Sequence, residues 1–203
     1  MKQNREEKRR RNLVLIMGGI IILSMIVSIF AVYVDNASQD SLRYGSQDFK
    51  ITDNGYLTKI NGTAMAFYYY PAELERINIS AATIQKMHDS TFYVFLFSPN
   101  ASSDDLAFID VMRYDLSTQL NKQIYFAKTT DSENYPGLPV LSCANASKEA
   151  LFFVIDTNTS TADTRISDPS PTENPYCITM QARLKELLAL KDRLVYTNYG
   201  IMK

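Results

Sequence analysis

Two cysteines and one histidine are the residues best suited by type to covalent or metal chemistry. Cys143 lies in "LSCANAS", Cys177 in "NPYCITM" and His88 in "QKMHD". A cysteine nucleophile needs a base such as histidine, and a metal site needs more ligands than these three residues offer. Three interpretations of the cysteines stay open: a structural disulfide, which we favour, two buried free thiols, or a catalytic or metal site.

The segment "DDLAFIDVMRYD" carries four carboxylates, those of Asp104, Asp105, Asp110 and Asp115. Glycoside hydrolysis uses two carboxylates, but they must face each other across a cleft, which the spacing here does not indicate. Asp110 and Arg113 stand three residues apart, which predicts a surface ion pair on a helix. We therefore expect a solvated helix face.

The stretch "FYYYP", 67–71, places three tyrosines together. In a strand, Tyr68 and Tyr70 would face one side and Tyr69 the other, so that one side could stack on a sugar or a peptide. Sheet packing is the commoner role of strand tyrosines. The sequence has no G-x-S-x-G, P-loop, G-x-G-x-x-G or C-x-x-C motif, so we assign no catalytic, cofactor-binding or metal-binding residue and no cofactor.

Turn signals and hydrophobic patterns predict the elements of the N-terminal half. Asn-Gly pairs at 54–55 and 61–62 are typical of tight hairpins. They predict a three-stranded meander that ends at Pro71, with strands at about 47–53, 56–60 and 63–70. Ser80 is suited to cap a short helix that follows.

A β-α-β unit is predicted in the middle of the chain. Residues 91–99, "TFYVFLFSP", are so apolar that we expect a strand covered on both faces at the centre of a sheet. Ser102 or Ser103 would cap the next helix, and 123–129 would form a parallel strand reached by a right-handed crossover. The apolar positions of that helix are Leu106, Ile109, Met112, Leu116 and Leu120.

Apolar runs at 139–143, 150–157 and 176–181 predict three more strands, and the polar residues 158–174 predict a projecting excursion. The segment 182–197 has an amphipathic helical pattern, followed by Gly200 as a stop signal. Its apolar face is Leu184, Leu187, Leu188, Leu194 and Val195. We expect one mixed α/β (α+β) domain over 47–203, large enough to bury a core.

The N-terminal charge pattern predicts a membrane anchor. Residues 1–12 carry six basic and two acidic residues, whereas 13–34 are uncharged and long enough to cross a bilayer as a helix. No A-x-A-like site follows, so we expect an uncleaved signal anchor. The positive-inside rule then makes 1–12 a cytoplasmic tail, 13–34 a single transmembrane helix of the cell membrane and 35–46 a tether to an outward-facing domain.

Six N-x-S/T triplets all follow the apolar block, where chance predicts roughly two. They begin at Asn36, Asn61, Asn78, Asn100, Asn145 and Asn158. The excess predicts a glycoprotein in an extracytoplasmic compartment, and a composition rich in Asn, Ser and Thr is the alternative interpretation. Disulfides persist in such a compartment, which is why we favour a Cys143–Cys177 bridge, worth roughly 3–4 kcal/mol.

Several stretches in fixed order resemble a family of small, uncharacterised archaeal single-pass membrane-anchored proteins with an extracytoplasmic α/β domain. The stretches are "FYYYPAELERINIS", "FIDVMRYDLS", "LPVLSCANAS", "NPYCITMQ" and "LKDRLVYTNYGIM". The resemblance implies no activity and no catalytic residue. It implies a cell-surface setting and pairing of the two cysteine-containing segments, with Cys143 and Cys177 on neighbouring strands.

These observations predict a membrane-anchored extracytoplasmic interaction or envelope-structural module. Its partner would be a protein or, through spans that pack at Ser24 and Ser28, a second copy, although a lipid-facing span is favoured. The domain after residue 34 is mildly acidic, which excludes an electrostatic reason to bind nucleic acid.

Two other hypotheses stay open. One is an envelope enzyme with a noncanonical site, which a cleft near Cys143 with at least two acids or His88 would favour. The other is a pilin-like filament subunit, which would need a processing site that "KRRRN" does not resemble.

Overall fold

The computed structural model describes residues 17, 24–25, 41–158, 164–170 and 172–203. The chain divides into two compact units, Met1–Ser41 and Leu42–Lys203. In the part of the chain that the structure describes, no helix has both the length and the apolar character that a membrane crossing requires. Apart from Met17, Ser24 and Met25, the predicted span 13–34 lies outside the described residues, as does the tail 1–12, so both stay predictions.

A four-stranded meander opens the folded unit, in the sequential order β1-β2-β3-β4. Its strands are β1 (Ser41–Tyr44), β2 (Gln47–Thr52), β3 (Gly55–Ile60) and β4 (Thr63–Phe67). The predicted hairpins are confirmed, since β2–β3 and β3–β4 pair antiparallel and Asn61 and Gly62 have positive φ angles of 51° and 83°. β1 lies inside the predicted tether, so regular structure begins before residue 47.

The second sheet has five strands in the order β6-β5-β7-β9-β8. They are β5 (Phe92–Phe97), β6 (Gln123–Lys128), β7 (Ala150–Asp156), β8 (Arg165–Ser167) and β9 (Cys177–Gln181). β5 pairs parallel with both β6 and β7, which confirms the predicted β-α-β unit. The prediction that β5 is an interior strand covered on both faces is confirmed, since it lies between β6 and β7 and its residues 93–97 are buried, although β7 holds the middle position. The prediction that 158–174 only project is wrong, because β8 pairs antiparallel with β9.

Three α-helices and two 3₁₀ turns complete the described elements: η1 (Pro71–Leu74), α2 (Ala81–Asp89), α3 (Ser103–Gln119), η2 (Cys143–Asn145) and α4 (Glu186–Asn198). Both predicted caps are confirmed. The Ser80 hydroxyl accepts a hydrogen bond from the Thr83 amide at 3.0 Å, and the Ser102 hydroxyl accepts one from the Asp105 amide at 3.1 Å. The starts of α2 and α3 are therefore fixed by their own short sequences, whereas the start of α4 has no side-chain cap.

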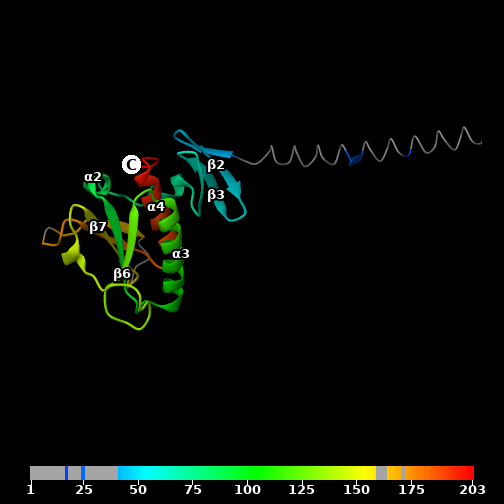
Figure 1. The fold of residues 1–203 in the computed structure, drawn as a ribbon. Helices are drawn as coiled ribbons and strands as arrows, with labels where there is room; N and C mark the ends of the chain where they lie inside the picture. Colours follow the sequence, from blue (N-terminus) through cyan, green and yellow to red (C-terminus); the bar gives the residue numbers. More distant parts are fainter. Residues whose placement is uncertain (1–16, 18–23, 26–40, 159–163, 171) are drawn as a thin grey trace, which may run out of the picture. The chain divides into compact units, whose positions relative to one another are not determined.

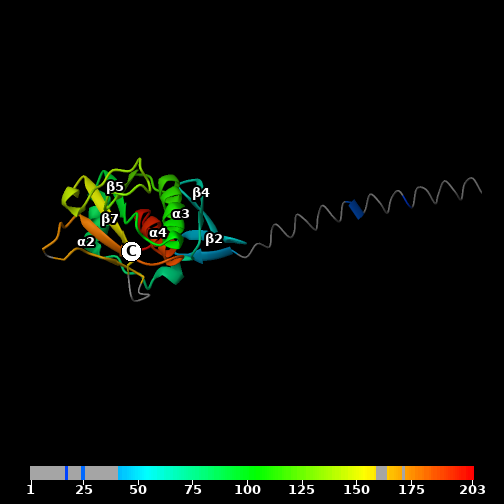
Figure 2. The same ribbon diagram turned by 90° about the horizontal axis from the view of Figure 1, so that it is seen from below.

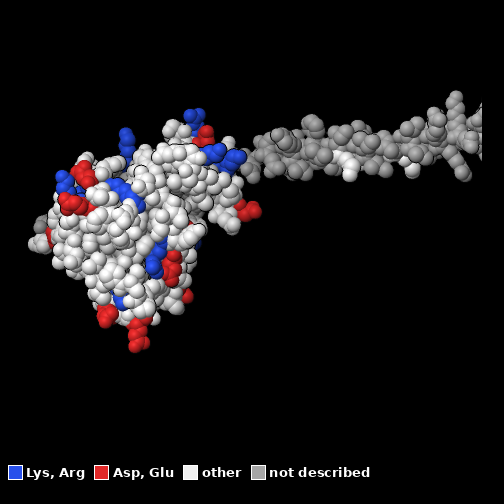
Figure 3. All heavy atoms as spheres, viewed as in Figure 1, with Lys and Arg blue, Asp and Glu red and all other residues white. Residues whose placement is uncertain are grey.

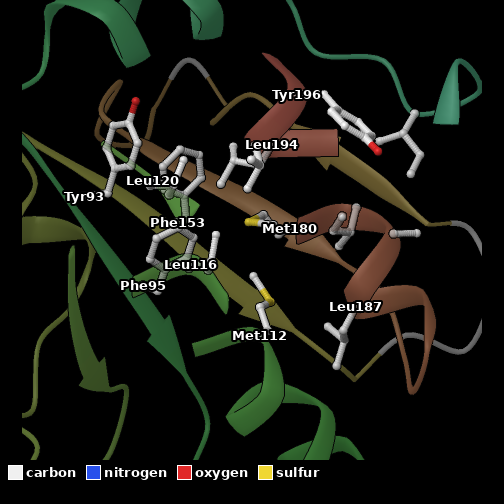
Figure 4. Packing of buried hydrophobic residues seen from close by; sticks show 14 of the residues in the cluster. Tyr93, Phe95, Met112, Leu116, Leu120, Phe153, Met180, Leu187, Leu194 and Tyr196 are labelled. Atoms are coloured by element: carbon white, nitrogen blue, oxygen red, sulfur yellow. The ribbon is translucent and has the colours of Figure 1, made fainter. Parts of the chain in front are cut away.

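Helices α3 and α4 lie side by side between the two sheets (Figures 1 and 2). On one side, Phe95 and Phe153 of the five-stranded sheet point toward Met112 of α3 and Leu194 of α4 (Figure 4). On the other side, Tyr196 of α4 stacks on Phe67 of β4, with ring centroids 4.2 Å apart. Since both sheets cover α4, every residue from Leu187 to Thr197 is buried.

The predicted C-terminal helix is confirmed, and Leu187, Leu188, Leu194 and Val195 of its predicted apolar face are buried, but the expectation that the helix is amphipathic is wrong. α4 begins at Glu186 rather than at 182, and it has no solvated side. Leu184, which the pattern placed on the apolar face, precedes the helix with a positive φ of 52° and is 41% exposed. The charged residues Lys191 and Asp192, which made the segment look amphipathic, are 0% exposed.

The opposite face of the five-stranded sheet is covered by the connection from β6 to β7. Val94, Leu96 and Phe152 form a second apolar cluster there, against which Leu141 and Cys143 pack. The strand predicted at 139–143 is absent from this described segment, which has a single bridge, Lys128 to Val140, before η2. The segment pairs with the last residue of β6 alone, where the Lys128 amide donates to the Pro139 carbonyl at 2.8 Å and the Leu141 amide donates to the Lys128 carbonyl at 3.0 Å. Beyond this point the chain has to cross β5 to reach β7.

The predicted disulfide is confirmed. Cys143 and Cys177 are joined with a Cα–Cα distance of 5.4 Å across a sequence separation of 34 residues. The expectation of two neighbouring strands is wrong, because Cys143 begins η2 and Cys177 begins β9. The bridge therefore fastens the covering loop, residues 129–149 between β6 and β7, to the sheet. The loop that the disulfide closes corresponds to roughly 3–4 kcal/mol of stability.

We predict that Leu187→Asp lowers the free energy of unfolding of the protein by several kcal/mol. Leu187 is 0% exposed between the two sheets, so the new carboxylate would be buried without a partner or would have to take up a proton. Leu184→Asp is the matched control, because Leu184 is 41% exposed. Thermal melting decides: equal melting temperatures of the two variants would contradict the enclosed position of α4.

Candidate ligand-binding site

The five-stranded sheet reverses its direction of growth between β5 and β7. After β5 the chain passes through α3 to β6 on one side, and the next strand, β7, is placed on the other side of β5. In open α/β sheets, the loops that leave two such parallel strands diverge at their carboxyl ends and form a crevice in which ligands bind. The topology thus points to the carboxyl ends of β5 and β7.

A hollow of about 420 Å³ lies at this point, and we call it the carboxyl-end pocket. The loop after β5 and the first turn of α3 form one wall, the end of β7 forms another, and Arg183 comes from the turn before α4. The lining residues are Ser98, Asn100, Ala101, Ser102, Asp105, Ile155, Asp156, Thr157, Asn158 and Arg183. The wall is mostly polar and has no aromatic ring, so it suits hydrogen bonding better than stacking.

Asp105 is the most enclosed charged group of the pocket, at 2% exposure. One carboxylate oxygen accepts a hydrogen bond from the Leu184 amide at 2.9 Å, and the other accepts one from the Ser102 hydroxyl at 2.6 Å. The Arg183 Nε lies 3.9 Å from the second oxygen. The expectation that Asp105 belongs to a solvated helix face is wrong, because the turn before α4 covers the start of α3.

Asp156 ends β7 on the other wall of the pocket. Its Oδ1 accepts a hydrogen bond from the Asn158 amide at 2.9 Å, and its Oδ2 accepts one from the Gln181 side chain at 3.0 Å. Both carboxylates are thus held in place by the protein and act as fixed acceptors. Neither Asp156 nor Arg183 was predicted as a site residue from the sequence. The usable signal for Asp156 was an acid directly after the apolar run "ALFFVI".

The cysteines and His88 lie at the other end of the sheet. Cys177 is the first residue of β9 and carries Cys143 with it through the disulfide, while exposed His88 is in the last turn of α2, just before β5. The enzyme hypothesis required a cleft near Cys143 that contains two acids or His88. The two acids of the carboxyl-end pocket, Asp105 and Asp156, lie at the opposite end of the sheet from Cys143. Among the described residues, no group of three or more His, Cys, Asp or Glu side chains could hold a metal ion.

The remaining acids of α3 face two different environments. Asp110 pairs with Arg113 at 2.8 Å, which confirms the predicted surface pair. Asp115 instead turns toward α4, where one of its oxygens lies 3.2 Å from the ammonium group of the fully buried Lys191. The solvated-face prediction therefore fails for Asp115 as it does for Asp105.

Asp115, Lys191 and Asp192 form a buried charge cluster between the helices and the meander. The Lys191 ammonium lies 2.5 Å from Asp192 Oδ1, and Asp192 Oδ2 accepts the backbone N–H groups of Tyr68 and Tyr69 at 2.8 and 2.9 Å. Tyr68 and Tyr69, which were predicted inside a strand that runs to residue 70, thus follow the end of β4 and fasten the meander to α4. Burial raises the pKa of the Asp192 carboxyl to about 6, although Lys191 and the two amides lower it.

All five predicted glycosylation sites that the structure describes are exposed. They are Asn61, Asn78, Asn100, Asn145 and Asn158, whereas Asn36 lies outside the described residues. Asn100 and Asn158 also line the carboxyl-end pocket. Exposure makes modification sterically feasible, and glycosylation itself stays a prediction.

Acidic and basic side chains are interspersed over the face drawn in Figure 3.

Comparison of the chain with models of protein families gives no match, and comparison with curated proteins and with solved structures gives none either. The resemblance to archaeal membrane-anchored proteins therefore stays a prediction, and the candidate site depends on the geometry of this chain.

We predict that Asp192 makes the protein less stable as the pH rises from 4 to 7. Its pKa of about 6 in the folded state exceeds the unfolded value near 3.9, so the folded state binds more protons in this window and stability falls as the pH rises through it. Asp192→Asn should remove this slope, which amounts to roughly 2–3 kcal/mol over the window.

Denaturant unfolding at pH 4, 5, 6 and 7 measures the effect. Asp53→Asn is the control, because Asp53 is exposed in the turn between β2 and β3. The slope of stability with pH is the readout rather than the absolute stability. An Asp192→Asn slope equal to that of the wild type would show that Asp192 does not take up a proton in this range.

Proposed function

We propose that the protein is a membrane-anchored, outward-facing binding module that recognises a small polar ligand in the carboxyl-end pocket. One observation carries the proposal: a polar hollow of about 420 Å³ occupies the switch point of the parallel sheet, the position where open α/β sheets bind ligands. The uncharged run 13–34 and the sequons after it support the anchor and its orientation.

Binding is favoured over catalysis by the state of the acids. Asp105 and Asp156 each accept two hydrogen bonds from the protein, which suits fixed recognition groups better than a proton donor and acceptor pair. The one disulfide removes both cysteines as nucleophiles. The interaction-module hypothesis is therefore the one that the geometry supports, with the pocket as its binding site.

The orientation is tested in cells that express the chain with a tag at each end. Protease added to intact cells should remove the domain after residue 34 and leave the N-terminal tag protected, because the basic residues 1–12 favour the cytoplasmic side. Digestion of the N-terminal tag with protection of the domain would reverse the proposed topology.

The pocket is tested by thermal melting of the purified protein with a panel of small polar compounds: amino acids, sugars, nucleotides and carboxylic acids. A ligand at about 100 times its Kd should raise the melting temperature by roughly 5–10 °C. Ala101→Trp, which fills the pocket, should abolish the rise, whereas Ala82→Trp on the exposed side of α2 should preserve it. A panel without any compound that is sensitive to Ala101→Trp would contradict the proposed function.

A further inference from the structure

We propose that the ligand of the carboxyl-end pocket is a small zwitterion of the α-amino-acid type, which carries a carboxylate and an ammonium group. This inference rests on the proposed function and adds the chemical class of the ligand. It follows from the charges on the pocket walls and from the partners that those charges already have.

Arg183 supplies the cation of the pocket lining. Its side chain is 54% exposed, and its Nε lies 3.9 Å from Asp105, too far for a hydrogen bond. Among the described residues, no hydrogen bond of the Arg183 guanidinium is found, so its planar fork of N–H donors is directed to solvent or ligand. A guanidinium of this kind binds a carboxylate through two parallel hydrogen bonds.

Asp156 supplies an acceptor close by, because its backbone carbonyl accepts a hydrogen bond from the amide of Ala182, the residue before Arg183, at 3.2 Å. Each of its oxygens accepts one hydrogen bond, from the Asn158 amide or from Gln181, and a carboxylate oxygen can accept two. One acceptor position therefore remains on each oxygen, and an ammonium group has three donors to fill them. Asp105, in contrast, is 2% exposed and tied to Leu184 and Ser102, so it offsets part of the Arg183 charge.

The other ligand classes fit less well. A phosphate would place two negative charges beside two carboxylates with one guanidinium to compensate. A metal ion would be repelled by the positive charge of Arg183. A sugar would find no aromatic ring in the lining on which to stack. A zwitterion neutralises Arg183 and Asp156 together, and a hollow of about 420 Å³ accommodates a molecule of amino-acid size.

Isothermal titration of the full chain in detergent tests the inference with matched probes. L-alanine, L-serine and L-glutamate carry both charges, propionate lacks the ammonium group, ethylamine lacks the carboxylate, and glucose and inorganic phosphate represent the other classes. We expect at least one amino acid to bind, with propionate and ethylamine at least tenfold weaker, since each lacks one charge-assisted contact.

Variants connect the binding to the two charged residues, Arg183 and Asp156. Arg183→Met and Asp156→Asn should each raise the Kd of the amino acid at least tenfold, and Arg183→Lys should restore part of the affinity because it keeps the charge. Lys148→Met and Glu133→Gln are the controls, because both residues are exposed and neither lines the pocket. Thermal melting confirms that each variant is folded.

The outcomes separate the two proposals. Amino-acid binding that both wall variants weaken supports the inference. Binding of glucose or phosphate that Ala101→Trp abolishes, without amino-acid binding, would overturn the ligand class and leave the proposed function intact. Amino-acid binding that is indifferent to Arg183 and Asp156 would also overturn the inference. If none of the probes and no panel compound binds, the proposed function fails together with it.

Discussion

The enclosure of α4 between two sheets is the constraint on which the rest of the structure depends. A helix with no solvated side must supply internal partners for every charge that it carries, since an unpaired buried charge costs several kcal/mol. Asp192 finds its partners in the amides of Tyr68 and Tyr69, and Arg193 donates to the Ile77 carbonyl at 2.7 Å. The contacts of Asp192 orient the meander on the helix, because Tyr68 and Tyr69 directly follow β4 and both of their amides donate to the same carboxylate oxygen.

The same enclosure determines the geometry of the pocket. Since α4 is fixed, the turn that leads into it is fixed as well, and the amide of Leu184 meets Asp105 at the start of α3. Arg183, one residue earlier, is thereby held at the pocket wall. A residue with no recognisable sequence signature acquires its place in the site through the packing of a helix that begins three residues later.

Local signals in the sequence were sufficient for local structure. The structure confirms the predicted hairpin at Asn61 and the predicted caps at Ser80 and Ser102, which depend on residues a few positions apart. It also confirms the β-α-β unit, whose two strands are joined by one helix. The disulfide followed from the compartment that the anchor and the sequons implied.

What the sequence did not reveal depends on distant parts of the chain. The pattern of α4 is amphipathic, and nothing within 182–197 tells that a second sheet covers its polar side. The loop 139–143 is as apolar as a strand, yet its pairing with the sheet is limited to one bridge at Lys128, because the chain then crosses β5 to reach β7. Asp156 and Arg183 are far apart in sequence and meet at the pocket because of the strand order, so no spacing rule could join them.

The disulfide of the covering loop has a consequence for the solubility of the protein. In a cell compartment rich in thiols, the bond between Cys143 and Cys177 would not persist, and the loop would be held by its apolar contacts alone. Each opening would bare Val94, Leu96 and Phe152, an aromatic and aliphatic strip on parallel strands of the kind that drives chains to aggregate. The reduced chain is therefore expected to aggregate more readily than the oxidised chain.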